Sequence, residues 1–281
     1  SNYINEDTPE KETYNNSINK GQSIIDAQTD PTLDGGAISN VITEIDSAEK
    51  GLHGADKLQQ AQNHAIIEVN GLDALNPAQK AKERDNILAA TNKSDITPQL
   101  EHAKALNQAM EQLKQSIATK NKTLNSSNYI NEDSEKKLAY DNAVSEAEQL
   151  LNQQNNPTMD KDVINAVTEK VNNARNDLNG ADKLVQNQTE SNAVINQLPN
   201  LNEKQKQALN ELINNSTSKQ KVAEIIAQAN ELNNEMGRLK TLVDEQPTVH
   251  QQSNYSNEDE NIQNTYDNAI HKGQDIINGN D

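Results

Sequence analysis

The sequence predicts an all-α protein of tandem three-helix bundles, linked by long shared helices into an elongated rod. Two observations support this prediction. The segment SNYINED at 1–7 returns at 127–133 and, as SNYSNED, at 253–259, so the chain repeats at a step of 126 residues. Within each copy, apolar residues recur at steps of three and four, the spacing of one helix face. Such an array gains reach or valency with each copy, whereas a catalytic domain needs one site.

The repeat step sets the expected domain boundaries. Repeat 1 spans 1–126, repeat 2 spans 127–252, and 253–281 is the truncated start of a third repeat. We expect two bundles in each repeat, over 1–58, 59–126, 127–184 and 185–252. Two full copies and a partial third indicate a segment of a longer array, so a missing leader sequence says nothing about the parent protein.

Composition favours thin helical bundles over a wide core. The chain has no Cys, Trp or Phe, only six Tyr, 32% hydrophobic residues and a net charge of −18. Low hydrophobicity with high charge is also typical of disorder, but the regular apolar spacing argues against it. Neither repeat contains a basic patch, so nucleic acid and membrane surfaces are disfavoured as partners. Repulsion between like charges favours an extended monomer.

The first bundle of each repeat is expected to begin with two helices. The first starts at Thr8, as an N-cap hydroxyl before proline. The second starts near Asp34, and its apolar stripe passes through Gly51 and Gly54 without losing phase. We therefore predict one continuous helix from there to Asn70 that serves both bundles, with the glycines allowing close packing.

The second bundle is expected to add a short helix and a longer one. Asn76 and Asn202 begin the short helix, each followed by Gln at the third helical position in a pattern similar to a capping box. The longer helix begins near Thr97, and its stripe continues to Leu124 in repeat 1. In repeat 2, Pro247 predicts a kink or an early end.

Apolar or aromatic residues on these stripes form the expected core. They are Tyr14, Ile24, Ile45, Leu52, Leu58, Met110, Tyr140, Leu150, Val171, Leu178, Leu184 and Met236. We interpret the Tyr and Met residues as core residues and expect the tyrosine hydroxyls to reach solvent or a polar partner.

No pattern of residues indicates catalysis. The five His residues are His53, His64, His102, His250 and His271. The first three are replaced by Asn, Glu and Gln one repeat later, so they build no common site, and we expect exposed side chains. Pairs of acidic residues recur at 6–7, 132–133 and 258–259, where helix capping is favoured over a cation site. We assign no catalytic, cofactor-binding or metal residues, expect no cofactor, and leave ligand-binding residues unassigned.

Three further blocks resemble a known family. They are GADKL at 54–58 and 180–184, L-x-x-LN-x-x-QK at 72–80 and 198–206, and LNxxM at 106–110 and 232–236. With the tyrosine-bearing first helix, these blocks resemble the alternating FIVAR and GA modules of giant Gram-positive surface proteins. The first bundle of each repeat is then FIVAR-like and the second GA-like. The resemblance implies three-helix bundles in a larger protein anchored to the membrane or wall at the cell surface.

The resemblance also implies a function and partners. We expect a non-enzymatic spacer, adhesin or envelope-supporting element that binds extracellular matrix, with fibronectin as a ligand, through many weak contacts. The alternative is a specific serum-albumin or fibronectin receptor module. Albumin-binding GA modules present aromatic anchors around their second helix, whereas residues 78–90 and 203–213 contain no aromatic residue. Albumin is therefore the less favoured partner.

Overall fold

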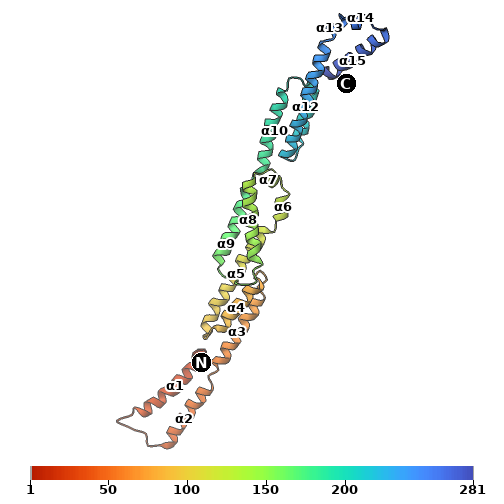
Figure 1. Cartoon of the computed structure of the whole chain (residues 1–281). Coiled ribbons are helices and arrows are strands. Elements are labelled where there is room, and N and C mark those ends of the chain that lie inside the picture. Colours follow the sequence, from red (N-terminus) through yellow and green to blue (C-terminus); the bar gives the residue numbers. More distant parts are fainter. Residues whose placement is uncertain (1, 281) are drawn as a thin grey trace. The chain divides into compact units, whose positions relative to one another are not determined.

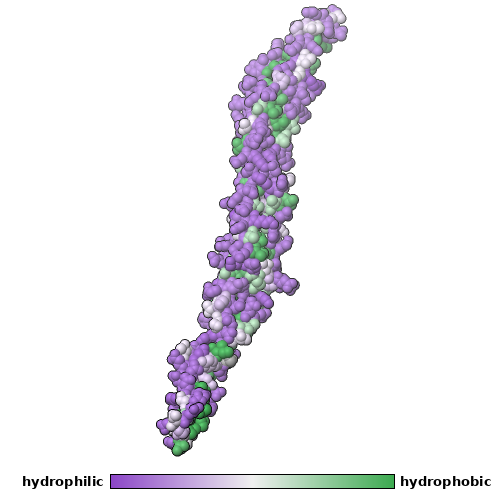
Figure 2. Space-filling model, turned by 90° about the vertical axis from the view of Figure 1, so that its left-hand side faces the viewer, coloured by the Kyte–Doolittle hydropathy of each residue, from purple (hydrophilic) through white to green (hydrophobic). Residues whose placement is uncertain are grey.

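A computed structural model describes residues 2–280, so Ser1 and Asp281, the outer ends of the predicted repeats, lie outside the described residues. Between these limits every regular element is a helix, which confirms the all-α prediction. The chain divides into two compact units, 1–118 with 142–172 and 119–141 with 173–281 (Figure 1). The face shown in Figure 2 is mainly hydrophilic, with small separate hydrophobic patches. None of the described helices is long and apolar enough for a membrane span.

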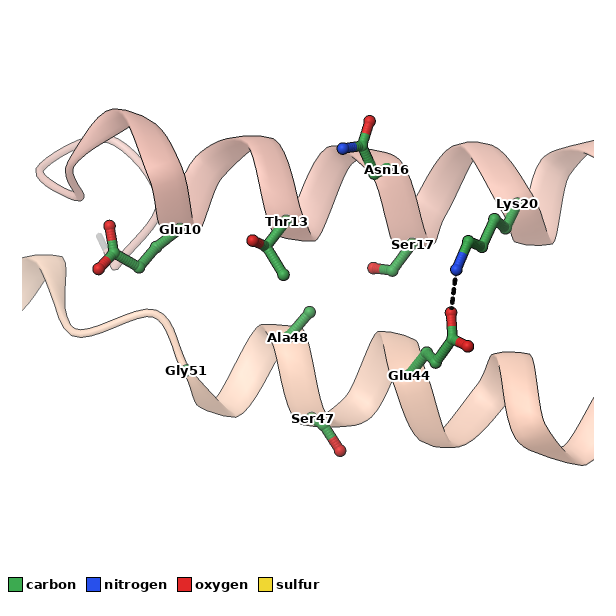
Figure 3. A pocket seen from close by; sticks show the side chains of 9 residues that line it. All are labelled: Glu10, Thr13, Asn16, Ser17, Lys20, Glu44, Ser47, Ala48 and Gly51. Carbon is green, nitrogen blue, oxygen red and sulfur yellow. Dashed lines mark hydrogen bonds and ion pairs between the residues drawn. The ribbon is translucent and has the colours of Figure 1, made fainter.

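The first unit begins with a helical hairpin of α1 (Thr8–Ile25) and α2 (Gly35–Lys50). The predicted start of the second helix is confirmed, because the Asp34 side chain accepts a hydrogen bond from the backbone N–H of Gly36 at 2.8 Å. The two helices lie side by side, with small side chains such as that of Ala48 between them (Figure 3).

A three-helix bundle follows in the same unit. It consists of α3 (Gly54–Asn70), α4 (Pro77–Ala89) and α5 (Ile96–Ile117), with a 3₁₀ turn, η1 (Lys93–Asp95), before the last helix. Its buried cluster comprises Ala65, Val69, Ile87, Ile96 and Ala103. Each helix contributes one apolar stripe, which is how a chain so poor in large hydrophobic residues forms a core.

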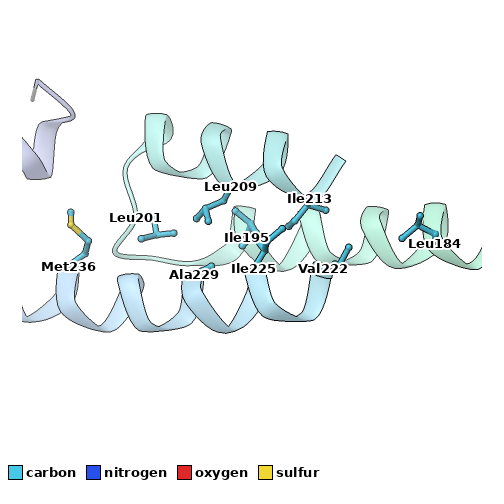
Figure 4. Close-up of a cluster of buried hydrophobic side chains, with 9 residues drawn as sticks. All are labelled: Leu184, Ile195, Leu201, Leu209, Ile213, Val222, Ile225, Ala229 and Met236. Atoms are coloured by element: carbon cyan, nitrogen blue, oxygen red, sulfur yellow. The ribbon is translucent and has the colours of Figure 1, made fainter. Parts of the chain in front are cut away.

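The second unit contains the corresponding bundle of repeat 2. It consists of α10 (Gly180–Gln197), α11 (Glu203–Asn214) and α12 (Lys219–Asp244). Figure 4 shows its buried cluster, which comprises Leu184, Ile195, Leu201, Leu209, Ile213, Val222, Ile225, Ala229 and Met236. This cluster again draws on all three helices.

Capping boxes begin the short helix of both bundles. The Asn76 side chain accepts from the backbone N–H of Gln79 at 2.9 Å, and the Gln79 side chain accepts from the backbone N–H of Asn76 at 3.1 Å. Asn202 and Gln205 form the same reciprocal pair. The structure therefore confirms the predicted caps and places these helix starts correctly.

The remaining helices connect and extend the bundles. They are α6 (Lys120–Leu124), α7 (Ser127–Ile130), α8 (Ser134–Leu151), α9 (Lys161–Asn176), α13 (Gln246–His250), α14 (Ser253–Ser256) and α15 (Glu260–Asn278). The division between the two units passes through α8 and α9. In the second unit α15 packs on the C-terminal half of α12.

The prediction of one continuous helix from Asp34 to Asn70 is wrong. The structure ends α2 at Lys50 and begins α3 at Gly54, and it ends α9 at Asn176 and begins α10 at Gly180. A break of three residues is close to one helical turn, so the apolar stripe keeps its phase across it and periodicity does not reveal it. The break lets Leu52 turn inward, where 6% of its surface is exposed.

The predicted end of the longer helix, which begins near Thr97, is wrong in repeat 1. The sequence predicts that the helix continues to Leu124, but α5 ends at Ile117 and α6 is a separate short helix. In repeat 2 the early end is confirmed, because α12 stops at Asp244 and Pro247 lies in the first turn of α13. Both copies therefore break at nearly the same place, and only one of them contains proline.

The expected core residues fall into two groups. Eight are buried, namely Leu52, Met110, Tyr140, Leu150, Val171, Leu178, Leu184 and Met236. Four are half-buried, namely Tyr14, Ile24, Ile45 and Leu58. The first three of these lie on the α1–α2 hairpin, where two helices bury less surface than a bundle of three.

Candidate functional site

Two sequence blocks, SNYINED and GADKL, are the same in both repeats, and within each repeat they contact one another. We call this contact a junction and define it by the residues that it joins. Junction 1 joins residues 2–7 to 53–57 and 91–93, within the first unit. Junction 2 joins residues 128–133 to 179–183 and 217–219, within the second unit. Each junction connects the start of one module to the bundle that follows it.

An asparagine side chain holds the turn before the last helix of each bundle. In junction 1, the Asn5 Nδ2 donates to the carbonyl oxygen of Thr91 at 3.1 Å, and its Oδ1 accepts from the backbone N–H of Lys93 at 2.7 Å. Junction 2 repeats these bonds through Asn131, Thr217 and Lys219, at 3.1 and 2.9 Å. Both asparagines are 2% exposed, so their amides depend on these protein partners.

A buried glutamate joins the same segment to the start of α3. The Glu6 carboxylate accepts from the backbone N–H of His53, which precedes the helix, and from that of Asp7 at 2.9 Å. It also forms an ion pair with Lys57, and its side chain is fully buried. Hydrogen bonding from Lys57 and from these backbone N–H groups lowers the pKa of Glu6 to about 2.

Junction 2 places Glu132 in the same environment. Burial alone would raise the pKa of this carboxyl, but hydrogen bonds from Lys183 and from the backbone N–H groups of Asn179 and Asp133 lower the pKa to about 2. Lys183 pairs with both carboxylates of the junction, and this raises the pKa of its ammonium. An ion pair with satisfied backbone hydrogen bonds therefore recurs at the repeat step.

The predicted capping role of the acidic pairs is wrong at the start of α1. Asp7 is the N-cap residue there, Thr8 is already helical, and neither supplies a side-chain cap. Instead, Asp7 accepts from the Nζ of Lys57 at 2.7 Å and of Lys93 at 2.6 Å, and these lysines lower its pKa to about 2. Carboxylate oxygens of Glu6, Asp7 and Glu10 lie within 4.8 Å of one another, and the Lys57 ammonium pairs with all three residues.

Glycine is required at the start of α3 and α10 because the backbones approach closely. A Cβ atom on Gly54 would lie 2.0 Å from the carbonyl oxygen of Asn2, and one on Gly180 would lie 2.5 Å from that of Asn128. The adjacent residues strengthen the contact, since the Asn128 Oδ1 accepts from the backbone N–H of Ala181 at 3.1 Å. The first residue of the GADKL block must therefore be glycine because of this close approach, and not because of its backbone conformation.

The third copy of the block lies at residues 253–259 and forms no junction within the described residues. Asn257 and Glu258, which correspond to the buried Asn131 and Glu132, are exposed. The Glu258 carboxylate accepts from the neighbouring N–H of Asp259 at 3.2 Å.

All three copies contain a pair of tyrosine rings in contact. The pairs are Tyr3 with Tyr14, Tyr129 with Tyr140 and Tyr255 with Tyr266, with centroids 5.8, 6.1 and 5.8 Å apart. In repeat 2 the outer hydroxyl, on Tyr129, donates to Asp141 at 2.8 Å; burial and then this carboxylate raise the pKa of Tyr129 to about 12. The inner hydroxyl, on Tyr140, is buried without a hydrogen-bond partner, contrary to expectation.

The histidines lie apart from one another. Exposure is confirmed for His53, His64, His102 and His271. The prediction of an exposed side chain is wrong for His250, which is half-buried. Its ring stacks on that of Tyr255 with the centroids 4.3 Å apart, and its Nε2 lies 2.8 Å from an oxygen of Asp267. The short helices α13 and α14 bring these residues together, and the sequence pattern did not predict that turn.

Sequence reasoning missed the residues that make the junctions. The sequence predicted close packing at Gly54 but did not identify its partner, and it indicated no role for the asparagine or the two lysines. One signal was available: SNYINED and GADKL are the two blocks that return unchanged, and Lys93 returns as Lys219 at the same step. Residues that bind one another must be retained together, so a shared repeat step predicts contact.

Two family models match the chain in alternation. The FIVAR domain matches residues 1–53, 109–179 and 235–281, and the GA module matches 55–109 and 181–235. The chain therefore belongs to the FIVAR domain family, with GA modules between its FIVAR domains. The boundaries at 109 and 235 fall inside α5 and α12, so one long helix contributes to a GA module and to the following FIVAR domain.

The chain is similar to staphylococcal proteins named for matrix binding. Over 141 residues, half of this chain, it is 42% identical to the extracellular matrix-binding protein ebh of Staphylococcus aureus strain MW2 and 41% identical to EbhA of strain Newman. These matches span only 1% and 4% of the relatives' lengths. A crystal structure of the EbhA 756–1003 domain from S. aureus aligns with a TM-score of 0.73 at 27% identity, over 82% of this chain and 91% of that one.

Proposed function

We propose that this chain is a segment of a non-enzymatic repeat protein on the surface of a Gram-positive bacterium, held there by a membrane or wall anchor elsewhere in the parent. Its role is that of a spacer and adhesin that binds host extracellular matrix through many weak contacts. The recurrence of the junction carries this proposal. The same hydrogen bonds recur 126 residues later, which supports an array of alike modules that can present a shared contact surface more than once.

Multivalency is the physical basis of the proposed adhesion. A second contact made by a linked module is intramolecular, so weak contacts combine into high avidity when several engage together. The names of the similar staphylococcal proteins support matrix as the partner class. Fibronectin is the first ligand to test, because the family resemblance implies it.

One exposed patch recurs at the repeat step and is our candidate contact surface. Tyr3 and Ile4 are 39% and 58% exposed, and Ile130, one repeat later, is 45% exposed beside Tyr129. The ammonium of Lys11 lies 5.8 Å from the Tyr3 ring centroid. Tyrosine is enriched among the residues that contribute most to binding at protein interfaces. Most other large exposed apolar residues lack an exposed apolar counterpart in the next repeat.

Binding to immobilised fibronectin tests the proposal. The intact chain should bind with an apparent affinity that rises with fibronectin density, as multivalent contacts require. A double variant, Ile4→Asp with Ile130→Asp, should weaken binding by about tenfold or more if the recurring patch makes the contacts. Ile67→Asp is the control, because Ile67 is 70% exposed but its counterpart one repeat later is Ala193, so no large apolar side chain recurs at this position.

The same experiment separates the proposal from a single-site receptor. A specific albumin or fibronectin receptor module would bind with a fixed stoichiometry and an affinity independent of ligand density. Serum albumin is the comparison ligand, and the absence of aromatic residues from α4 and α11 argues against its binding. If the chain binds fibronectin at no density, the proposed adhesive role is contradicted and only the spacer role remains.

A further inference from the structure

A glutamate is buried in the three-helix bundle of the first unit. Glu83 lies in the middle of α4, one helical turn from Gln79 and one from Ile87, and all three residues are 0% exposed. The Oε2 atom of Glu83 is shielded from solvent and has no hydrogen-bond partner. A carboxylate in such a place is costly unless a positive charge pairs with it.

The imidazole of His102 is the partner of this carboxylate within the described residues. It extends from α5, and its Nδ1 lies 2.8 Å from Oε1 of Glu83. The side chain of His102 is 46% exposed, whereas that of Glu83 is 0% exposed. The ring therefore connects a group in the core with the solvent, and it is the one kind of side chain that ordinarily gains or loses a charge near neutral pH.

Other charged groups beside the pair have partners of their own or lie in solvent. Lys80 and Arg84 of α4 both donate to Asn70, at 2.9 and 3.5 Å, and Lys82 and Asp85 are exposed. Three ion pairs occupy the charged groups of α3 and α5 nearby in sequence, namely His64–Glu68, Lys104–Glu68 and Lys104–Glu101 at 3.3, 2.9 and 3.5 Å. The charge that balances the buried carboxylate is therefore the proton of the imidazole.

The bundle of repeat 2 lacks this pair at the same positions. One repeat after Glu83 is Leu209, which belongs to the buried cluster in Figure 4, and one repeat after His102 is Gln228. Leucine in the core needs no charged partner. The same chain thus contains one bundle with the buried pair and one without it.

A change in pH alters the charge of the pair. While the imidazole is protonated, its charge balances that of the carboxylate. Once the imidazole is neutral, the carboxylate stays charged in the core without a cation beside it, and a buried charge left without its partner is strongly destabilising. In acid the carboxyl can itself bind a proton and be buried neutral, at lower cost. The bundle should therefore weaken as the pH rises.

We propose that Glu83 and His102 form a pH-sensitive switch in the bundle of repeat 1, which loosens as His102 loses its proton above neutral pH. A histidine that binds its proton more tightly in the folded chain than in the unfolded chain stabilises the fold at low pH, and this contribution is lost as the pH rises. The opening is local to α3, α4 and α5, because the bundle of repeat 2 has no such pair. Two neighbouring bundles thereby respond differently to the same change in pH.

An NMR titration of the histidine ring protons in the intact chain tests the pairing. Glu83→Gln keeps the shape of the side chain and removes its charge, so the titration midpoint of His102 should fall by about one pH unit. The midpoint of His64, which lies 3.3 Å from a different carboxylate, that of Glu68, should stay the same. An unchanged midpoint of His102 would overturn the proposal.

Hydrogen exchange measures the opening of each bundle separately. After correction for the pH dependence of exchange itself, protection of the α4 amides should fall by about tenfold between about pH 6 and pH 8.5, while that of α11 stays constant. A double variant, Glu83→Leu with His102→Gln, gives repeat 1 the residues of repeat 2 and should abolish this fall. His64→Gln removes an exposed histidine from α3 and should retain it. An equal fall in α4 and α11, or a fall that persists in the double variant, would contradict the switch.

Discussion

The side chain of Asn131 accepts a hydrogen bond from the backbone N–H of Lys219 at 2.9 Å, and Asn5 accepts one from Lys93 at 2.7 Å. In both repeats the two residues are 88 positions apart in sequence. The bond therefore ties a FIVAR domain to the turn that begins the last helix of the next GA module. Coupling between neighbouring modules depends on this turn as well as on the peptide chain.

Removing that asparagine should loosen the junction. Asn131→Ala deletes the two junction hydrogen bonds, to Thr217 and from Lys219, together with two local bonds to Ser127. It leaves a carbonyl and an N–H group of the turn without partners, so the free energy of unfolding should fall by about 2 kcal/mol. Chemical denaturation measures this loss, and hydrogen exchange at Lys219 should report it locally. Asn257→Ala is the matched control, because this residue occupies the same repeat position but is exposed. Equal effects at both positions would show that the junction adds no stability.

Two glycine substitutions should have opposite effects. Gly180→Ala places a Cβ atom 2.5 Å from a backbone oxygen of Asn128 and should destabilise the protein by about 1–3 kcal/mol. Gly51→Ala meets only ordinary contacts at 3.4 Å, and its φ of −75° suits alanine. It should stabilise by about 0.4–1 kcal/mol through the unfolded chain. Thermal unfolding of both variants checks the signs, and a stable Gly180→Ala variant would contradict the close approach.

The sequence predicted the helices well and the junctions poorly, for a physical reason. Apolar stripes and caps such as Asn76 are local signals, so the helix type, the repeat and the capping boxes could be predicted. The break after Lys50 could not, because its three residues preserve the stripe. It depends on Glu6 binding the N–H of His53 from 47 positions away. Contacts between residues so far apart in sequence produce no periodic pattern. Only the two blocks that return unchanged at the same repeat step indicated them.

The junction carboxylates should make stability depend on pH in the acid range. The pKa of Glu6 and of Glu132 is lowered from 4.5 to about 2 in the folded chain. A depressed folded pKa contributes stability above the unfolded pKa, and this contribution is lost as pH falls through the folded value. Denaturation midpoints should therefore decline between about pH 5 and pH 2. Glu132→Gln should flatten this decline, whereas Glu258→Gln, at the exposed third copy, should not. The same profile for both variants would assign the pH dependence to other groups.

The buried ring of Tyr140 should stabilise the fold, whereas its hydroxyl should not. The side chain is fully buried and its ring contacts Tyr129 edge-on, so Tyr140→Ala should cost about 3–5 kcal/mol. Tyr140→Phe keeps the ring and removes a hydroxyl that has no hydrogen-bond partner, so it should be neutral or stabilising. Tyr266→Ala, at the half-buried equivalent in α15, should cost less than Tyr140→Ala. Chemical denaturation of the three variants measures these differences. A loss of more than about 1 kcal/mol in Tyr140→Phe would show that a bound water satisfies the hydroxyl and that this core is wet.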